Sequence, residues 1–525
     1  MTAGQTTPCH TAHRLLRLPL QRPLLDYFEL FRHEDYAFFL DSALPSQNLG
    51  QYSFLGGNPF LVFRAWRASQ RGGGTPRCEI LQLPAAAPPS GDLQLADRFG
   101  RQPQWIVQRT DNPFDVLQHL LDRYAVDRQS YAATPVPLLA GAVGYLGYEA
   151  AHFLERLPDT AQDELQLPDM YFLFCDQILA HCHHSGQSFL SVSARATDPQ
   201  TAARQAEEKL QQMRGRIDQL ERHPPPAWNG PQQAAGGEPG DLEIETHFDE
   251  ASYAAQVRQI KEHIYAGVVY QTCMTHRLQS PLYGSDAWNL YRELRRINPA
   301  PFASFLQFPE ASLASASPER FLRLDARRVA ESRPIKGTRP RSSMPEADLA
   351  LRDELSASQK DQAENIMIVD LVRNDFGRVC QFHSVHVPEL MAIEPYATVF
   401  QMVSTVRGTL RDHVTPLDLV RACFPGGSMT GAPKIEAMKI IDSLEPVCRG
   451  IYSGAIGYLD FSGVLDLSIV IRSFVIKEQT CYYHVGGAIV ADSDERAEYL
   501  ETMTKARALK QALANLRAVA EQGSA

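Results

Sequence analysis

The order of hydrophobic and polar positions predicts a chain of many short β-strands with fewer helices. Strand-like runs lie at 36–40, 52–56, 60–64, 139–148, 170–174, 302–308, 322–330, 451–459 and 467–475. Helical patterns lie at 201–223, 249–267 and 361–375, and from about residue 494. A stretch at 72–89, rich in Gly and Pro, predicts a loop. Because strands and helices do not alternate regularly, the pattern favours an α+β fold over a doubly wound sheet.

A change of composition near the middle of the chain predicts two domains. Residues 224–241 are dominated by Pro, Gly, Gln and Ala, which cannot bury enough surface to order a segment. A length of 525 residues also exceeds what one ordinary core holds. We therefore expect an N-terminal domain at 1–223, a flexible linker at 224–244 and a second domain at 245–525.

Composition limits the classes of function and location. A net charge of −10 argues against nucleic-acid binding, which needs a basic face. The most apolar stretches, such as 465–476, are short and contain charges, so we expect no membrane span. The polar start at 1–10 does not resemble a signal peptide, and nine scattered cysteines fit a reducing compartment. We expect a soluble cytoplasmic protein, and an anionic small-molecule ligand stays possible.

The segment at 331–341 places one lysine, Lys336, among three arginines, with Pro334 before it and Gly337 after it. Proline restricts the backbone and glycine allows a turn. Nearby cations oppose protonation of an amine, so Lys336 could be a neutral nucleophile. From these residues alone, a solvated basic loop is the simpler interpretation. Glu319 could face the same pocket as an acid, or could cap a turn after Pro318.

Two further kinds of segment carry groups suited to an anion and a metal. The glycine-rich stretch at 424–434 precedes a predicted helix, whose first N–H groups could hold a carboxylate. Glu498 and Glu501 lie one turn apart on the predicted C-terminal helix, and Glu364 lies near the start of another. Such carboxylates could bind Mg²⁺, which prefers oxygen ligands. They could equally be exposed helix charges that pair with lysine or favour a helix N-terminus.

Together these segments resemble the chorismate-utilising enzymes over roughly residues 245–515. The strongest signatures occur in the family's order, at 334–341, 368–375, 425–434, 469–473 and 486–491. The N-terminal half resembles the family's matching domain more weakly, as at 52–59. The resemblance implies a fold like that of anthranilate synthase component I. Large mixed β-sheets would form a sandwich-like core flanked by helices, and the second domain would be catalytic and bind chorismate.

One position separates the branches of this family. Anthranilate-forming and isochorismate-forming members typically carry Ala where this chain has Lys336, whereas 4-amino-4-deoxychorismate-forming members carry Lys. The resemblance therefore implies amination of chorismate at ring carbon 4, on the route to 4-aminobenzoate and folate. The alternatives are an anthranilate-forming enzyme and a non-catalytic subunit that binds chorismate. The second alternative draws on Gln401, which replaces a His of many members and cannot titrate near neutrality.

The resemblance also implies a role for each candidate residue. Lys336 would add to ring carbon 2 while Glu319 protonates the departing hydroxyl. Glu364 and Glu501, with Glu498 close by, would hold Mg²⁺. The neighbouring arginines and the metal would lower the pKa of the Lys336 amine. The substrate-binding set would be Arg472, Tyr452, Thr430, Gly431, Gly486, Gly487 and Thr338.

Ammonia for this reaction would have to come from a partner. None of the nine cysteines lies in a Gly-x-Cys-x-Gly elbow, so the resemblance implies a separate glutamine amidotransferase subunit. A further enzyme, a lyase, would be needed to make 4-aminobenzoate. Some members bind tryptophan as an inhibitor through a Leu-Leu-Glu-Ser motif. The stretch at 24–27 matches only half of that motif, so we expect no tryptophan feedback.

Overall fold

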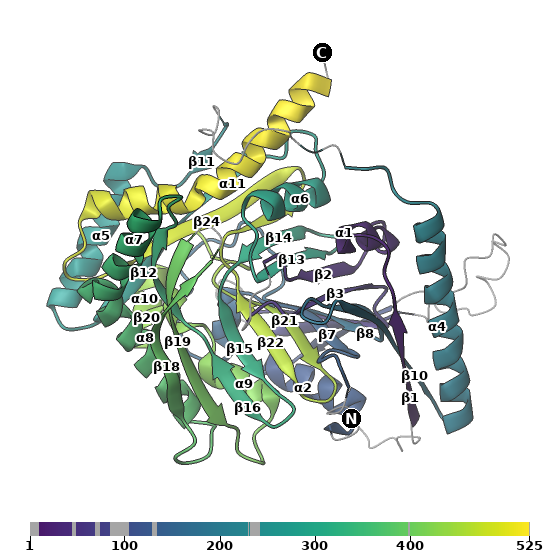
Figure 1. Cartoon of the computed structure of the whole chain (residues 1–525). Coiled ribbons are helices and arrows are strands. Elements are labelled where there is room, and N and C mark those ends of the chain that lie inside the picture. The colour runs from purple at the N-terminus through teal and green to yellow at the C-terminus, as the bar shows by residue number, and fades with distance from the viewer. Residues whose placement is uncertain are drawn as a thin grey trace.

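Two large antiparallel sheets of twelve strands each make up the core of the computed structural model (Figure 1). The structure describes residues 10–44, 49–68, 74–83, 104–128, 134–228, 230, 242–396 and 399–523. Helices lie around the sheets, which confirms the predicted α+β class. Among the described residues, no helix is both long enough and apolar enough to cross a membrane.

The first sheet joins strands from both ends of the chain. Its order is β1 (His10–Leu18), β10 (Gln187–Ala196), β9 (Gln177–Cys182), β3 (Tyr52–Gly57), β2 (Ala37–Asp41), β13 (Phe302–Gln307), β14 (Ser312–Ser317), β23 (Ser473–Lys477), β24 (Thr480–Ile489), β12 (Gln271–Pro281) and β11 (Glu245–Thr246). The short strand β20 (Gly431–Ala432) also pairs with β12.

The second sheet likewise contains strands from both the N-terminal and the C-terminal half of the chain. Its order is β17 (Ile335–Pro340), β19 (Val399–Thr409), β16 (Val329–Ser332), β15 (Arg320–Leu324), β22 (Leu465–Ile469), β21 (Ala455–Asp460), β7 (Gly141–Leu146), β8 (Met170–Cys175), β4 (Leu61–Trp66), β5 (Arg77–Gln82) and β6 (Gln104–Arg109). Strand β18 (His386–Pro395) pairs with β19.

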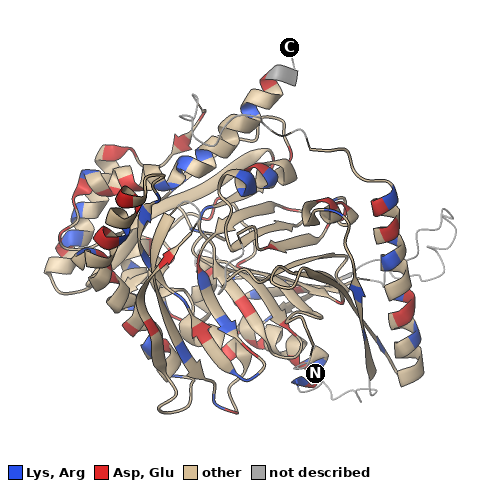
Figure 2. Cartoon of the chain, in the orientation of Figure 1, with Lys and Arg blue, Asp and Glu red and all other residues tan. Residues whose placement is uncertain are grey.

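The helices cover the sheets and their ends. The α-helices are α1 (Leu24–Tyr27), α2 (Pro113–Tyr124), α4 (Pro199–Arg222), α5 (Glu250–Tyr265), α6 (Ala287–Ile297), α7 (Pro345–Ala357), α8 (Gln359–Gly377), α9 (Pro416–Cys423), α10 (Lys434–Leu444) and α11 (Glu495–Gly523). Short 3₁₀ helices lie at Phe28–Leu30, Tyr148–Phe153 and Gly427–Met429. Acidic and basic residues alternate along α4, as expected for a helix with an exposed face (Figure 2).

Both halves of the chain contribute strands to both sheets. In the first sheet β2 pairs with β13, and in the second β7 pairs with β21. Apolar side chains from the two halves therefore share one core; Phe28, for example, contacts Phe305 with ring centroids 5.5 Å apart. The predicted domain boundaries stay a prediction. Residues 229 and 231–241, most of the predicted linker, lie outside the described residues.

Three predicted segments differ from the structure. The run at 322–330 is two strands, β15 and β16, with Arg328 at a positive φ of 64° between them. The run at 467–475 is also two strands, β22 and β23, which belong to different sheets. The predicted loop at 72–89 contains β5, while 72–73 and 84–89 lie outside the described residues.

In the second sheet, the pairing of β7 with β8 leaves no room for a side chain at Gly144. A Cβ added at Gly144 would lie 1.9 Å from the Tyr171 carbonyl oxygen, so the backbones would have to separate. We predict that Gly144→Ala destabilises the protein by about 3 kcal/mol and lowers its thermal unfolding midpoint. The matched control is Gly215→Ala in α4, where a Cβ would meet nothing within 4 Å. That variant should be slightly stabilised, and equal midpoints for both variants would contradict the packing described.

Candidate active site

Lys336 and three candidate carboxylates converge where β17, α8 and α11 meet. Strand β17 packs against α8, and Lys360 of α8 pairs with Glu498 in the first turn of α11. The Lys336 Nζ lies 3.8 Å from Glu364 Oε2, and each of the two side chains is 13% exposed. The lysine is therefore mostly enclosed beside an acid, which excludes the solvated basic loop.

A bulge in β17 sets the direction of Lys336. The pairing of β17 with β19 shifts register between Ile335 and Thr338, and Gly337 between them has a φ of +84°. A Cβ at Gly337 would lie 2.8 Å from the Asp361 carboxyl carbon on α8, so only glycine fits this close approach. Thr338 lies opposite Gln401 of β19, and the Gln401 side chain is buried.

The three arginines near Lys336 are each paired with an acid. Contacts of 2.8 Å and 2.7 Å join Arg339 to Glu354 and Arg341 to Asp348, and Arg333 pairs with Glu394. These pairs offset much of the arginine charge, and the predicted effect of the arginines on Lys336 stays a prediction.

Each of the three candidate metal ligands is paired with a lysine. Lys336 lies beside Glu364 as described, Lys505 Nζ lies 2.7 Å from Glu501 Oε1, and Lys360 Nζ lies 3.8 Å from Glu498 Oε1. The two carboxylates of α11 also border one glycine. A Cβ at Gly487 would lie 3.0 Å from Glu498 Oε2 and 3.8 Å from Glu501 Oε1.

The protonation of these carboxylates reflects burial and neighbouring charge. Burial raises the pKa of Glu364, although Lys336 and Lys360 oppose the shift. Burial also raises the pKa of Glu498, helped by the Glu501 charge and opposed by a 2.7 Å hydrogen bond from the Ser493 hydroxyl. Burial acts in the same direction on Glu501, but Lys505, with smaller contributions from the other lysines, lowers its pKa overall.

The carboxylates form a suitable donor set for Mg²⁺. They come from α8 and α11, and hard divalent cations take such oxygen ligands together with water. Among the described residues, no three His, Cys, Asp or Glu side chains already converge at ligand distances. The binding of a metal here, and its identity as Mg²⁺, therefore stay predictions.

Glu319 lies just before β15, close enough to Lys336 and Arg472 to interact with both charges. It is 5% exposed. Burial raises the pKa of Glu319 to about 7, while the neighbouring Ser428 hydroxyl, Lys336 and Arg472 limit the shift. A carboxyl group that titrates near neutrality suits an acid that donates a proton.

Arg472 is a half-buried cation with its guanidinium group available. It has a φ of 52° and stands at the point where the chain passes from β22 of the second sheet to β23 of the first. Burial lowers its pKa and the Glu319 charge opposes this. Among the described residues, no hydrogen bond or ion pair of the Arg472 guanidinium is present. Such a group can receive a substrate carboxylate.

Tyr452 and the glycine-rich segment are held by a buried Arg449–Glu445 ion pair, with an Nη2–Oε1 distance of 2.6 Å. The Arg449 guanidinium also donates to the Met429 carbonyl at 2.7 Å and to the Cys273 carbonyl at 2.9 Å. The Tyr452 amide donates to the Arg449 carbonyl at 3.2 Å. The pair therefore connects β12, the glycine-rich segment and the tyrosine. The sequence analysis did not predict this ion pair, because the sequence indicates it only through an acid and a base four residues apart.

The glycine-rich segment leads into α10, as predicted, and touches β12 closely. A Cβ at Gly431 would lie 2.1 Å from the Gln271 carbonyl oxygen of β12. Gly486, which belongs to β24, also lies close to β12, since a Cβ there would be 2.3 Å from the Met274 carbonyl oxygen. Both donors of Thr430 are used within the segment: its amide donates to Gly427 at 3.4 Å and its hydroxyl to Gly426 at 3.3 Å. These groups would have to turn outward to bind a carboxylate.

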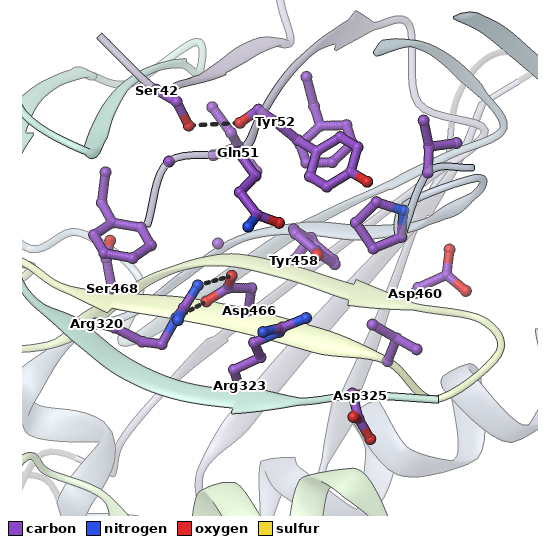
Figure 3. A pocket seen from close by; sticks show the side chains of 18 of the residues that line it. Ser42, Gln51, Tyr52, Arg320, Arg323, Asp325, Tyr458, Asp460, Asp466 and Ser468 are labelled. Carbon is purple, nitrogen blue, oxygen red and sulfur yellow. Dashed lines mark hydrogen bonds and ion pairs between the residues drawn. The ribbon is translucent and has the colours of Figure 1, made fainter. Parts of the chain in front are cut away.

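A separate cavity of about 570 Å³ lies between the two sheets (Figure 3). Ser42 at the end of β2, Arg323 of β15 and Tyr458 of β21 are among the residues that line it. The stretch at 24–27 forms α1 and is not among them. The expectation about tryptophan feedback stays a prediction.

The chain is similar to known proteins both in its fold and in its sequence. By structure, the chain is similar to anthranilate synthase component I from Streptococcus pneumoniae, with a TM-score of 0.70, 26% identity, and coverage of 93% of this chain and 97% of the other. By sequence, a family model described as chorismate binding enzyme matches residues 94–511. The chain belongs to the chorismate binding enzyme family.

Two curated relatives are close to this chain in sequence. Aminodeoxychorismate synthase from Streptomyces pristinaespiralis is 39% identical over 92% of this chain, which spans 62% of the relative's length. Aminodeoxychorismate synthase component 1 from Escherichia coli K12 is 39% identical over 77% of this chain and 83% of its own length. The match to the family model extends further towards the N-terminus than the resemblance predicted at 245–515.

The raised pKa of Glu319 gives a direct spectroscopic prediction. Because burial favours the neutral form, the Glu319 carboxyl should stay protonated at pH 6 and ionise around pH 7. An infrared difference spectrum between the wild type and Glu319→Gln should show a protonated-carboxyl band that disappears as the pH rises past 7. A carboxylate signal already complete at pH 5 would contradict the site described.

Proposed function

We propose that this chain is an aminodeoxychorismate synthase component I, which converts chorismate and ammonia to 4-amino-4-deoxychorismate and water. The observation that carries the proposal is the enclosed Lys336, which interacts with both Glu319 and the Glu364 carboxylate. The similarity to relatives named for this activity supports it.

The first step of the proposed reaction uses Lys336 and Glu319. The Lys336 nitrogen, once deprotonated, forms a bond to ring carbon 2 as the ring double bonds shift. The hydroxyl at carbon 4 departs as water, with its proton supplied by Glu319. Lys336 is then covalently attached to the ring, and Glu319 is ionised.

In the second step, ammonia bonds to carbon 4. The double bonds shift back and the carbon–nitrogen bond to Lys336 breaks, so that the lysine leaves as an amine. The proton lost by the new ammonium group is available to the Glu319 carboxylate, which restores the acid. Two successive displacements place nitrogen para to the ring carboxylate, whereas one direct attack at carbon 2 would place it ortho.

The substrate's two carboxylates need separate partners. Glu364 and Glu501, with Glu498 beside them, would hold Mg²⁺, which when bound would supply the positive charge that anchors the ring carboxylate. Arg472 would receive the other carboxylate through charge-assisted hydrogen bonds, and Tyr452 would complete this side. Gly487 borders Glu498 and Glu501, so a side chain there would enter the carboxylate site, while Gly486 packs directly against β12.

Ammonia would come from a separate glutamine amidotransferase subunit, and free ammonium should replace it in the test tube.

A second candidate function is anthranilate formation, which the similarity to anthranilate synthase component I from Streptococcus pneumoniae favours. The two functions differ in product. Incubating chorismate, Mg²⁺ and ammonium should give 4-amino-4-deoxychorismate, and 4-aminobenzoate only after a lyase is added. Fluorescent anthranilate without a lyase would support the second function.

The assigned nucleophile gives a mutational prediction. Lys336→Ala should lower formation of 4-amino-4-deoxychorismate at least about a thousandfold, because no covalent intermediate can form. The matched control is Lys439→Ala, since Lys439 is an exposed residue of α10 paired with Glu436 at 2.8 Å. That variant should keep full activity. Unchanged amination at carbon 4 by Lys336→Ala, measured by chromatography and mass spectrometry, would refute the role of the lysine.

A further inference from the structure

Of the three lysines that pair with the candidate metal ligands, Lys360 is held least. Its side chain is 55% exposed, compared with 13% for Lys336 and 42% for Lys505. Lys505 has a second contact, a 2.8 Å hydrogen bond to the Gly486 carbonyl. In the described part of the chain, the Lys360 ammonium has no hydrogen bond or ion pair besides the one with Glu498.

The partner of Lys360 is a buried acid. The Glu498 side chain is 5% exposed, and its Oε1, which lies 3.8 Å from Lys360 Nζ, also accepts the 2.7 Å hydrogen bond from Ser493. Its other oxygen, Oε2, lies beside Gly487, towards Glu501. Lys360 thus approaches from the solvent side, from the first turn of α8, and neutralises a carboxylate whose other oxygen faces the site.

We propose that Lys360 is a displaceable counter-ion: its ammonium pairs with Glu498 and offsets the negative charge of the carboxylates until a divalent cation binds there. This inference rests on the proposed function, because it concerns the metal site assigned there. Each of the three carboxylates has a lysine beside it, and each ammonium offsets part of the attraction that the carboxylates would exert on an incoming divalent cation. Lys360 is already more than half exposed and can withdraw into water, whereas Lys336 is mostly enclosed and Lys505 also donates to the Gly486 carbonyl.

Lys360 therefore acts through Glu498 and is a positioning residue. Its long side chain is flexible and its ammonium is well hydrated in solvent, so its displacement costs little. Its effect is to weaken metal binding, since part of the attraction between Glu498 and the cation is used to displace the lysine. Removing its charge should strengthen metal binding, which is the opposite of what loss of a ligand or of a substrate contact would do.

The test measures metal binding in the absence of substrate. Titrating the full-length protein with Mg²⁺ or Mn²⁺ by calorimetry, Lys360→Met should bind about three- to tenfold more tightly than the wild type. Lys360→Arg, which keeps the charge, should bind like the wild type. Lys439→Met should also leave the affinity unchanged, because Lys439 pairs only with Glu436 on the same helix. Lys360→Gln provides a second neutral variant if the methionine variant folds poorly.

Equal or weaker metal binding by both neutral variants would overturn the inference and leave the proposed function intact. No binding of either metal to the wild type would overturn the inference together with the metal assignment. The product assay with Lys336→Ala tests the amination chemistry independently of both results.

Discussion

The ion pair between Lys336 and Glu364 is the interaction on which the candidate site depends. It joins the bulged strand β17 to helix α8 across 3.8 Å, in a place where both side chains are mostly enclosed. The pair can form only because Gly337 lets the strand come so close to α8. Because the amine is enclosed beside an acid, the proposed nucleophile must give up part of this pairing to reach a substrate. The Glu364 carboxylate that pairs with the lysine is also one of the proposed metal ligands, so the two proposed roles compete for it.

A second buried pair, Arg449 with Glu445, fixes the opposite wall. Its charges are satisfied by carbonyls of β12 and of the glycine-rich segment, and removing one partner of such a pair leaves an uncompensated buried charge. The backbone around Tyr452 is therefore tied to this pair, since the Tyr452 amide donates to the Arg449 carbonyl. On the other side, Arg472 stands at the crossing from one sheet to the other, with no protein partner for its guanidinium among the described residues. The two sheets thus meet at the position where a substrate carboxylate is proposed to bind.

Strong local patterns predicted much of this arrangement. Helices α8 and α11 and strands β2, β3, β4 and β8 lie where their periodicity placed them. The divided strands were missed because the residues with positive φ at the breaks are Arg328 and Arg472, and arginine gives no turn signal of the kind that glycine does. Interleaving of the two halves in both sheets depends on contacts far apart in sequence, which no local pattern carries. The sequence and its resemblance named Lys336, Glu319 and the three carboxylates, and the helical spacing offered Lys505 as a partner of Glu501. The pairing of Lys336 with Glu364 and of Lys360 with Glu498 emerged only from the fold.

The claim that a lysine becomes covalently attached to the substrate ring can be tested most directly by trapping that species. Protein incubated with chorismate and Mg²⁺ but no ammonia would be quenched rapidly, digested and analysed by mass spectrometry. The account predicts a peptide that contains Lys336 and carries the mass of chorismate less one water. An unmodified peptide under conditions in which the same sample aminates chorismate once ammonium is supplied, or attachment at a different residue, would contradict it.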